Sequence, residues 1–359
     1  MSHYEERLER DLNRIRGEVG KLAQRVEGAV KNAVHALLTG NDELAAATIL
    51  ADGHINRGMR RIDRLCHSFI AVHLPSAGHL RLISSIIRAN ILLERIGDYA
   101  VTICRELPQL SASPQGAIAR GMESMAQDVR QMLHQSIEAF EAGNAEMARG
   151  PMAMARQVQD AFSALFPDLL DESEPYPLRD RFALFVVFHR LERMADQAKN
   201  LCEEAVFSAT GEGKAAKVYR VLFIDEDDTC LSQMARAIAR AGFPNSGLYS
   251  SAGSQPGREL SRPMKAFLDQ RGIKLDDGAE PRPLDCTPAE LAEFHVIVSL
   301  QGPVKSRVAE LPFHTVGLSW DVGGVPDESA GAAAFEECHR KLAIMIRDLM
   351  VELRGEDAN

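Results

Sequence analysis

The sequence predicts a multidomain protein of class α followed by α/β: a bundle of six helices, then a domain with a central parallel sheet. Helix-favouring residues dominate before position 210, whereas short apolar runs alternate with helical stretches after it, as in an α/β domain. The stretch SATGEGKAAK (208–217), rich in small residues, separates the two parts. A chain of 359 residues is long enough for two hydrophobic cores. We therefore expect domains at 1–209 and 218–354, joined by a linker at 210–217.

The helical half contains two copies of a three-helix unit, at about 1–110 and 111–209. ALLTGNDELA (36–45) is echoed by AFEAGNAEMA (139–148); in each, Gly would end one helix and Asn would cap the next. LRLISSIIRANILLERIGD (80–98) aligns without a gap with LRDRFALFVVFHRLERMAD (178–196). These patterns predict helices at 4–39, 42–73, 77–108, 114–142, 145–166 and 177–208.

Each copy places a Glu and an Asp one helical turn apart, at Glu94 and Asp98 and at Glu192 and Asp196. Like charges at this spacing cost a few tenths of a kcal/mol on an isolated helix. A hard cation between the carboxylates would offset that cost, because oxygen ligands suit Mg²⁺, Mn²⁺ or iron. The alternative is a solvated acidic face with neighbouring arginines as partners.

Other polar residues near these pairs are weaker candidates. On the second helix, Asp52, His54 and Asp63 could complete a metal site, but we favour a solvated helix face. His189 lies one turn before Glu192, and we favour a buried polar residue over a ligand.

Composition narrows the class of protein. A net charge of −10 argues against a general nucleic-acid-binding surface, which needs a basic excess. No stretch approaches the ~20 apolar residues of a membrane span, and the charged start MSHYEERLER is unlike a signal peptide. The six cysteines form no C-x-x-C pair, which favours reduced thiols in a cytoplasmic protein.

The helical half resembles the PhoU family of phosphate-uptake regulators. The similarity lies in HLPSAGHLR (73–81), LERIGDYA (93–100) and LERMADQAKNLCEEA (191–205). The family has two three-helix repeats, each with an acidic-x-x-x-Asp motif on its third helix, although the His that often follows the motif is replaced by Tyr99 and Gln197.

This resemblance implies that Glu94, Asp98, Glu192 and Asp196 bind metal ions, with Mg, Mn, Zn or Fe as candidates. It also implies a cytoplasmic homodimer. Such a protein would act with a phosphate ABC transporter and its sensor histidine kinase to restrain phosphate uptake and starvation signalling. It would meet the membrane only through these partners and would bind no nucleic acid.

The carboxyl half opens with VLFIDEDDTCLSQMARAIAR (221–240). Its apolar start predicts a strand, and further strands are expected at VIV (296–298) and TVGL (315–318). Four acids, Asp225 to Asp228, occupy the strand–helix turn, where backbone N–H groups and the helix dipole usually favour an anion.

This half resembles the low-molecular-weight protein tyrosine phosphatases and arsenate reductases. That family places Cys-x5-Arg-Ser directly after its first strand; here the nucleophile position is Asp225, the arginine position is Leu231, and Ser232 is retained. MARAIARAGF (234–243) and SSAGSQPG (250–257) extend the likeness. The resemblance implies a phosphatase fold without its nucleophile and arginine, hence a non-enzymatic domain that would bind a partner or, through its acids, a cation.

Two alternatives for the carboxyl half remain open. As a haloacid-dehalogenase-type phosphatase, FIDEDDT (223–229) would supply Asp225 as nucleophile, Asp227 as acid/base and a Mg²⁺ site, with Asp321 and Asp327 as the further acidic pair. Asp327 is also the candidate general acid of the low-molecular-weight phosphatase interpretation. A response-regulator receiver would need a phosphoacceptor Asp after a third strand, and RGIKLDDGAEPRP (271–283) has no apolar run before its acids. For Cys230, in the loop, we favour packing over a redox role.

Overall fold

The computed structural model describes residues 3–170, 176–214, 216–276, 278–312, 314–326 and 332–359. The chain divides into two compact units, Met1–Lys214 and Ala215–Asn359, and each is described by itself. Within the described ranges, no helix is both long enough and apolar enough to cross a membrane.

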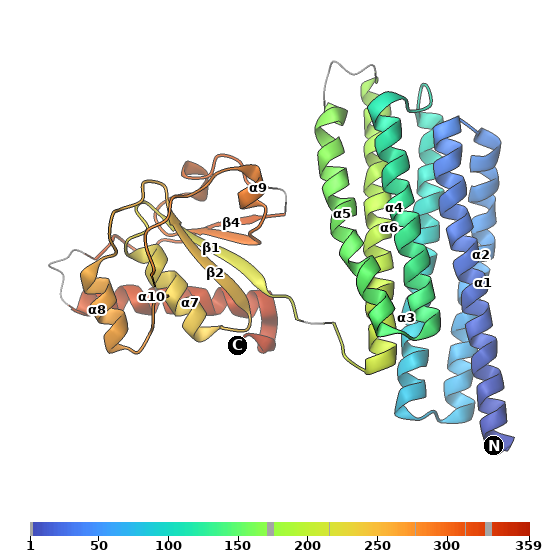
Figure 1. Ribbon diagram of the computed structural model, residues 1–359, viewed down its shortest axis with the longest axis horizontal. Helices are drawn as coiled ribbons and strands as arrows, with labels where there is room; N and C mark the ends of the chain where they lie inside the picture. The colour runs from blue at the N-terminus through green and yellow to red at the C-terminus, as the bar shows by residue number, and fades with distance from the viewer. Residues whose placement is uncertain (1–2, 171–175, 215, 277, 313, 327–331) are drawn as a thin grey trace. The chain divides into compact units, whose positions relative to one another are not determined.

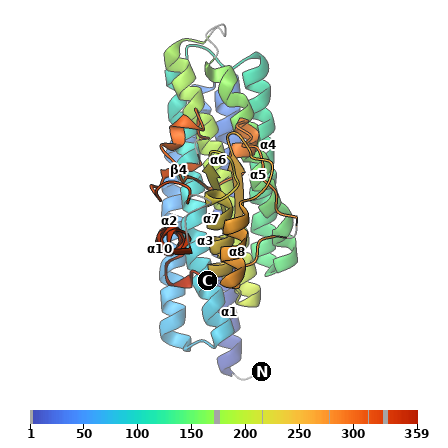
Figure 2. The ribbon, with the colours of Figure 1, turned by 90° about the vertical axis from the view of Figure 1, so that its left-hand side faces the viewer.

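The first unit is a bundle of long helices that lie side by side (Figures 1 and 2). A short 3-10 helix, Leu107–Gln109, follows the third. The third helix ends earlier than expected, and the fifth continues past Pro167, so the predicted end at 166 is wrong by one turn. The helices are α1 (His3–Thr39), α2 (Asp42–His73), α3 (Ala77–Glu106), α4 (Gly116–Ala142), α5 (Ala145–Leu170) and α6 (Leu178–Thr210).

The repeated Gly-Asn turns act as predicted. Gly40 and Gly143 adopt positive φ angles of 66° and 57°, the left-handed conformation that ends a helix at little cost for glycine. Asn41 Oδ1 accepts a hydrogen bond from the Leu44 N–H at 2.9 Å, and Asn144 Oδ1 accepts from the Glu146 N–H at 3.0 Å. These side chains satisfy N–H groups that have no partner within the helix.

The two motif helices are central to the bundle. α3 packs against α6, and each also packs against the other two helices of its own repeat. Gly97, just before the motif Asp of α3, lies against α2: a Cβ there would come within 3.1 Å of Ile55 Cδ1. The small residue therefore lets α3 approach α2 closely, which brings side chains of both helices to the first acidic pair.

The second unit has a four-stranded, wholly parallel sheet with the order β2-β1-β3-β4. The predicted central parallel sheet is therefore confirmed, although the sequence did not identify β2, whose polar stretch lacks an apolar run. The strands are β1 (Tyr219–Asp225), β2 (Gly247–Gly253), β3 (Val296–Ser299) and β4 (Val316–Ser319).

Both faces of the sheet are covered. Val221 and Phe223 of β1 pack with α7 (Leu231–Gly242), α8 (Arg262–Gln270) and α10 (Ala332–Arg354). Leu222 and Ile224 point to the opposite face, where they pack near α9 (Pro288–Leu291). Burial on both faces explains why β1 is a continuous apolar run rather than an alternating one.

Candidate functional site

Three carboxylates from two helices lie near one another in the first repeat. Glu94 and Asp98 lie on α3, and Asp52 lies on α2. The pKa of Glu94 is raised by burial and then by repulsion from Asp98 and Asp52. The pKa of Asp98 is also raised, first by the part of its side chain that is buried and then by Asp52, although the residue as a whole is exposed. The shared repulsion means that these side chains lie close enough to respond to one another's charge.

Asp52 belongs to this cluster rather than to the solvated face that the sequence analysis favoured. Its Oδ2 accepts a hydrogen bond from Asn56 Nδ2 at 2.6 Å. Its Oδ1 is buried without a hydrogen-bond partner, a costly state for a carboxylate oxygen. Sequence spacing could not reveal this role, because Asp52 is on a different helix and meets Asp98 only through the packing at Gly97.

The acids of the second repeat are paired with their own helix instead. Glu192 Oε2 lies 3.2 Å from His189 Nδ1, and Asp196 accepts a hydrogen bond from Arg193 at 2.7 Å. The repeat alignment that matches Asn41 with Asn144 puts Ala155 at the position of Asp52, so no third carboxylate is supplied. The buried role favoured for His189 is wrong, since the ring is partly exposed and stacks on Phe185.

The cluster of Asp52, Glu94 and Asp98 fits a hard cation better than the acidic pair of the second repeat does. Its donors are carboxylate oxygens, which suit Mg²⁺, Mn²⁺ or iron, and one of them has no protein partner. Among the residues that the structure describes, no group of three His, Cys, Asp or Glu side chains already converges into a metal-binding arrangement. A cation at Asp52, Glu94 and Asp98 would therefore have to draw these side chains closer together.

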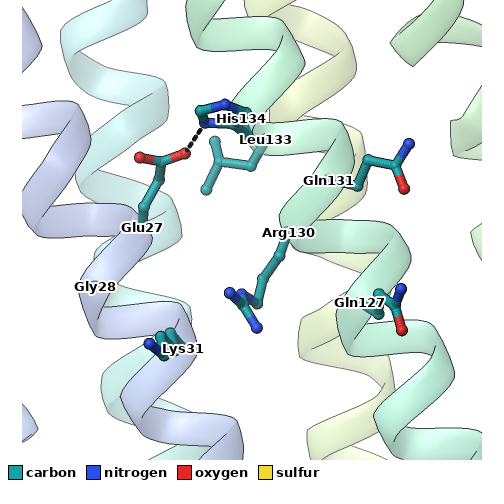
Figure 3. Close-up of a pocket in the computed structure, with 8 residues that line it drawn as sticks. All are labelled: Glu27, Gly28, Lys31, Gln127, Arg130, Gln131, Leu133 and His134. Carbon is teal, nitrogen blue, oxygen red and sulfur yellow. Dashed lines mark hydrogen bonds and ion pairs between the residues drawn. The ribbon is translucent and has the colours of Figure 1, made fainter.

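A separate groove lies between α1 and α4, with a cavity of about 550 Å³ (Figure 3). Glu27 of α1 and His134 of α4 close one side of it at 2.8 Å, and this hydrogen bond raises the pKa of His134. Arg130 extends into the space between the two helices, and Lys31 of α1 also lines the groove. None of the predicted metal ligands lines this groove.

The acidic loop of the second unit, Asp225–Leu231, lies where this kind of sheet usually binds ligands. It follows the carboxyl end of β1, and strand order reverses between β1 and β3. In open parallel sheets, ligands bind at the carboxyl ends of the strands at this point. The loop therefore occupies the expected position of a phosphate-binding turn.

The loop's own side chains already bond several of its N–H groups. Asp225 accepts from the Asp228 N–H at 2.7 Å through Oδ1 and from the Ser232 N–H at 2.9 Å through Oδ2. Asp227 Oδ1 accepts from the Thr229 N–H at 3.1 Å. These donors include the first turn of α7, the kind of group that binds phosphate at helix N-termini. A phosphate would thus have to displace carboxylates while being repelled by them.

Asp228 is a buried hub beneath the loop, and sequence reasoning missed it. Its carboxylate accepts hydrogen bonds from the Ser232 hydroxyl at 2.7 Å, Gln233 Nε2 at 3.0 Å and the Arg282 N–H at 2.8 Å. Its φ of 54° is left-handed, a conformation that Asp and Asn tolerate better than most residues. Its place within a run of four acids gave no signal of burial.

The remaining loop positions supply neither a reactive thiol nor a cation. Leu231, at the arginine position, is buried in the core. Burial raises the pKa of Cys230 to about 12, so the thiol stays protonated and is a poor nucleophile. Arg307 does reach the loop, but its guanidinium donates to the Asp225 carbonyl at 3.0 Å and to Ser254 Oγ at 2.7 Å, so it holds the backbone instead.

The buried acids predict a pH dependence for the second unit. Burial is the largest cause of the raised pKa of both Asp225 and Asp228. Their contribution to stability is therefore fully present below the unfolded-state value near 3.8 and is lost as pH rises through the folded-state pKa. These two acids favour the folded unit at mildly acidic pH, whereas His295 and His339, whose pKa values are lowered by burial, favour it at neutral pH. We therefore expect the parent to gain stability relative to Asp225→Asn as the pH falls from neutral to mildly acidic. Urea unfolding followed by fluorescence of Trp320, the single tryptophan, measures this; a parent that gains nothing on the variant over this range would contradict it.

The two acids proposed for a dehalogenase-type site gain no support. Asp321 is exposed. Asp327 lies outside the described residues, so its role as a general acid stays a prediction. In the described part of 271–283, the structure has no strand that could end in a receiver phosphoacceptor.

Comparison with known families agrees with the division into two units. Residues 19–107 and 122–205 match the PhoU domain, and residues 220–358 match the low molecular weight phosphotyrosine protein phosphatase family. The second match favours the first of the three interpretations of the carboxyl half.

Individual relatives resemble the first unit. The phosphate-specific transport system accessory protein PhoU homolog of Pseudomonas putida is 28% identical over 214 residues, which are 58% of this chain and 83% of that protein. The PhoU of Escherichia coli is 27% identical over 214 residues, with 58% of this chain and 88% of that protein covered. The crystal structure of PhoU from Pseudomonas aeruginosa matches with 28% identity and a TM-score of 0.54, over 57% of this chain and 99% of that one.

Proposed function

Since the chain joins a PhoU domain to a low molecular weight phosphatase-like domain, we propose that it is an accessory regulator of phosphate transport. Its named relatives are accessory proteins of phosphate-specific transport systems. By this resemblance, a phosphate ABC transporter and its sensor histidine kinase would be its partners, and it would act as a homodimer on the cytoplasmic side.

The first unit would hold a metal ion, and the observation that carries this is the cluster of Asp52, Glu94 and Asp98. The raised pKa values of Glu94 and Asp98 and the unpartnered Asp52 oxygen mark a concentration of negative charge that a cation would neutralise. Glu192 and Asp196 stay a prediction for a second site, because their present partners would have to be displaced first.

The second unit would act as a partner-binding domain without catalysis. The support is the loop at 225–231, where carboxylates bond the N–H groups expected to hold a phosphate. At 4 Å, a loop carboxylate and a phosphate charge would repel each other by ~4 kcal/mol at an effective dielectric near 20.

We expect the purified full chain to show no hydrolysis of p-nitrophenyl phosphate above background, with or without Mg²⁺. Asp225→Asn should give the same baseline, because no step depends on that carboxylate. Turnover that requires Mg²⁺ and disappears in Asp225→Asn would instead support the aspartate-phosphatase alternative.

The regulatory role is tested in a bacterial strain without its own PhoU. Expression of the full chain is expected to restore repression of a phosphate-starvation reporter at high phosphate. A Glu94→Gln/Asp98→Asn chain should restore less repression at equal protein level. Failure of the parent chain to repress, despite normal expression, would contradict the proposal.

A further inference from the structure

One side of the α1–α2 hairpin concentrates positive charge, although the whole chain is acidic. Eight Arg and Lys residues of α1 and α2 are spaced so that they lie on the outer side of both helices, and all eight are exposed. From Arg7 to Arg25 the stripe is about 27 Å long. We call this surface the basic face; it consists of Arg7, Arg14, Lys21, Arg25, Arg57, Arg60, Arg61 and Arg64.

Contacts between α1 and α2 show that the cations of the two helices form one surface. Arg25 Nη1 donates to the His54 carbonyl at 3.3 Å, and Arg61 Nε lies 3.2 Å from Glu18 Oε2. Arg7 and Arg14 line a small cavity together with Val72 of α2. The basic face therefore runs continuously along both helices.

Two carboxylates lie among the cations of the basic face, and each has a hydrogen-bonding partner. Glu18 lies 3.0 Å from Lys21 and 3.2 Å from Arg61, and its pKa is lowered, first by the Lys21 hydrogen bond. Asp11 Oδ2 lies 2.8 Å from His73 Nε2. Since eight cations share the surface with these two carboxylates, the face keeps a clear positive excess.

Apolar side chains are exposed at the end of the hairpin where α1 begins and α2 ends. The N-terminus of α1 and the turn between α2 and α3 lie at one end of the bundle (Figure 1). Leu74, in that turn, is 88% exposed and has a φ of 41°, a strained conformation for a residue with a Cβ. Val72 and Tyr4 are also exposed, and the Tyr4 hydroxyl donates to the His73 carbonyl.

We propose that the basic face and the Leu74 turn bind directly to an anionic lipid bilayer. Cations beside exposed apolar or aromatic side chains are typical of surfaces that bind anionic membranes. This contact goes beyond the proposed function, since it needs neither metal nor a transporter subunit, and it replaces the expectation that the protein meets the membrane only through its partners. A bilayer fits better than a protein or nucleic acid, because a protruding leucine without a facing pocket can enter lipid without shape complementarity.

Co-sedimentation of the full chain with lipid vesicles tests this. We expect it to pellet with vesicles of phosphatidylcholine plus phosphatidylglycerol, but not of phosphatidylcholine alone, and to be released by salt. Arg57→Glu/Arg64→Glu should weaken binding at least about 25-fold, since each cation near an anionic surface contributes about fivefold.

The matched control is Arg149→Glu/Arg156→Glu on α5, which has the same spacing and the same charge change and should bind nearly as the parent does. Leu74→Gly removes the apolar side chain but suits the positive φ, so binding should fall severalfold without loss of thermal stability. No binding to phosphatidylglycerol vesicles, or equal loss in both double variants, would overturn the proposal. So would retention on polyglutamate or duplex DNA with no vesicle binding.

Discussion

Asp228→Ala is expected to lower the free energy of unfolding of the second unit by about 3 kcal/mol, since each buried donor left unsatisfied costs roughly 1–3 kcal/mol. The carboxylate now accepts from the Ser232 hydroxyl, the Gln233 amide and the Arg282 N–H, and alanine accepts from none of them. Removal of the buried charge offsets part of this destabilisation, because burial disfavours the charged carboxylate, as the raised pKa of Asp228 indicates.

Asp228→Asn is the informative counterpart. Its amide oxygen can accept from Gln233 and Arg282, and its amino group can donate to the Ser232 hydroxyl, which can turn to accept. Asparagine also tolerates the φ of 54°. We therefore expect this variant to be at least as stable as the parent at neutral pH and to show a weaker pH dependence.

Urea unfolding of the full chain, followed by Trp320 fluorescence, reports the second unit selectively because the first contains no tryptophan. Asp227→Ala is the control for loss of a neighbouring acid, since Asp227 is less buried and accepts from the Thr229 N–H. If Asp228→Ala and Asp227→Ala cost the same, Asp228 is not the structural centre of the loop.

The loop shows what sequence can and cannot resolve about this unit. The apolar run of β1 and the helical spacing after it located the turn, because those patterns follow from burial. β2 was missed, because its sequence GLYSSAG gains strand structure only by pairing with β1. Likewise, Asp225 to Asp228 are four equivalent acids in the sequence, whereas the fold buries two and leaves Glu226 exposed.

The helical unit was easier to predict, because its determinants are local. Helix caps at Asn41 and Asn144 and a gap-free repeat fixed the helices to within a few residues. Internal similarity, however, suggested two equivalent acidic sites. The structure distinguishes them through residues outside the repeated motif: Asp52 joins one pair from α2, whereas His189 and Arg193 contact the acids of the other.

This difference predicts unequal effects on metal binding. Glu94→Gln/Asp98→Asn is expected to abolish most metal binding, because it removes two of the three carboxylate ligands of the first cluster. Without metal, the same variant should be more stable than the parent, since burial and mutual repulsion raise both pKa values and the neutral amides relieve them. Glu192→Gln/Asp196→Asn should retain most of the metal.

Elemental analysis of protein purified without chelator gives the metal content. Thermal unfolding with and without added Mn²⁺ measures how much metal binding stabilises the folded state. A ligand at 100 times its Kd stabilises the folded state by about 2.7 kcal/mol, so the parent should gain a clear rise in Tm that the first variant lacks. Asp52→Asn, which keeps the shape of the side chain, should reduce this rise. Equal metal loss in both double variants would mean that the two repeats build one shared centre, and the assignment to the first repeat would be wrong.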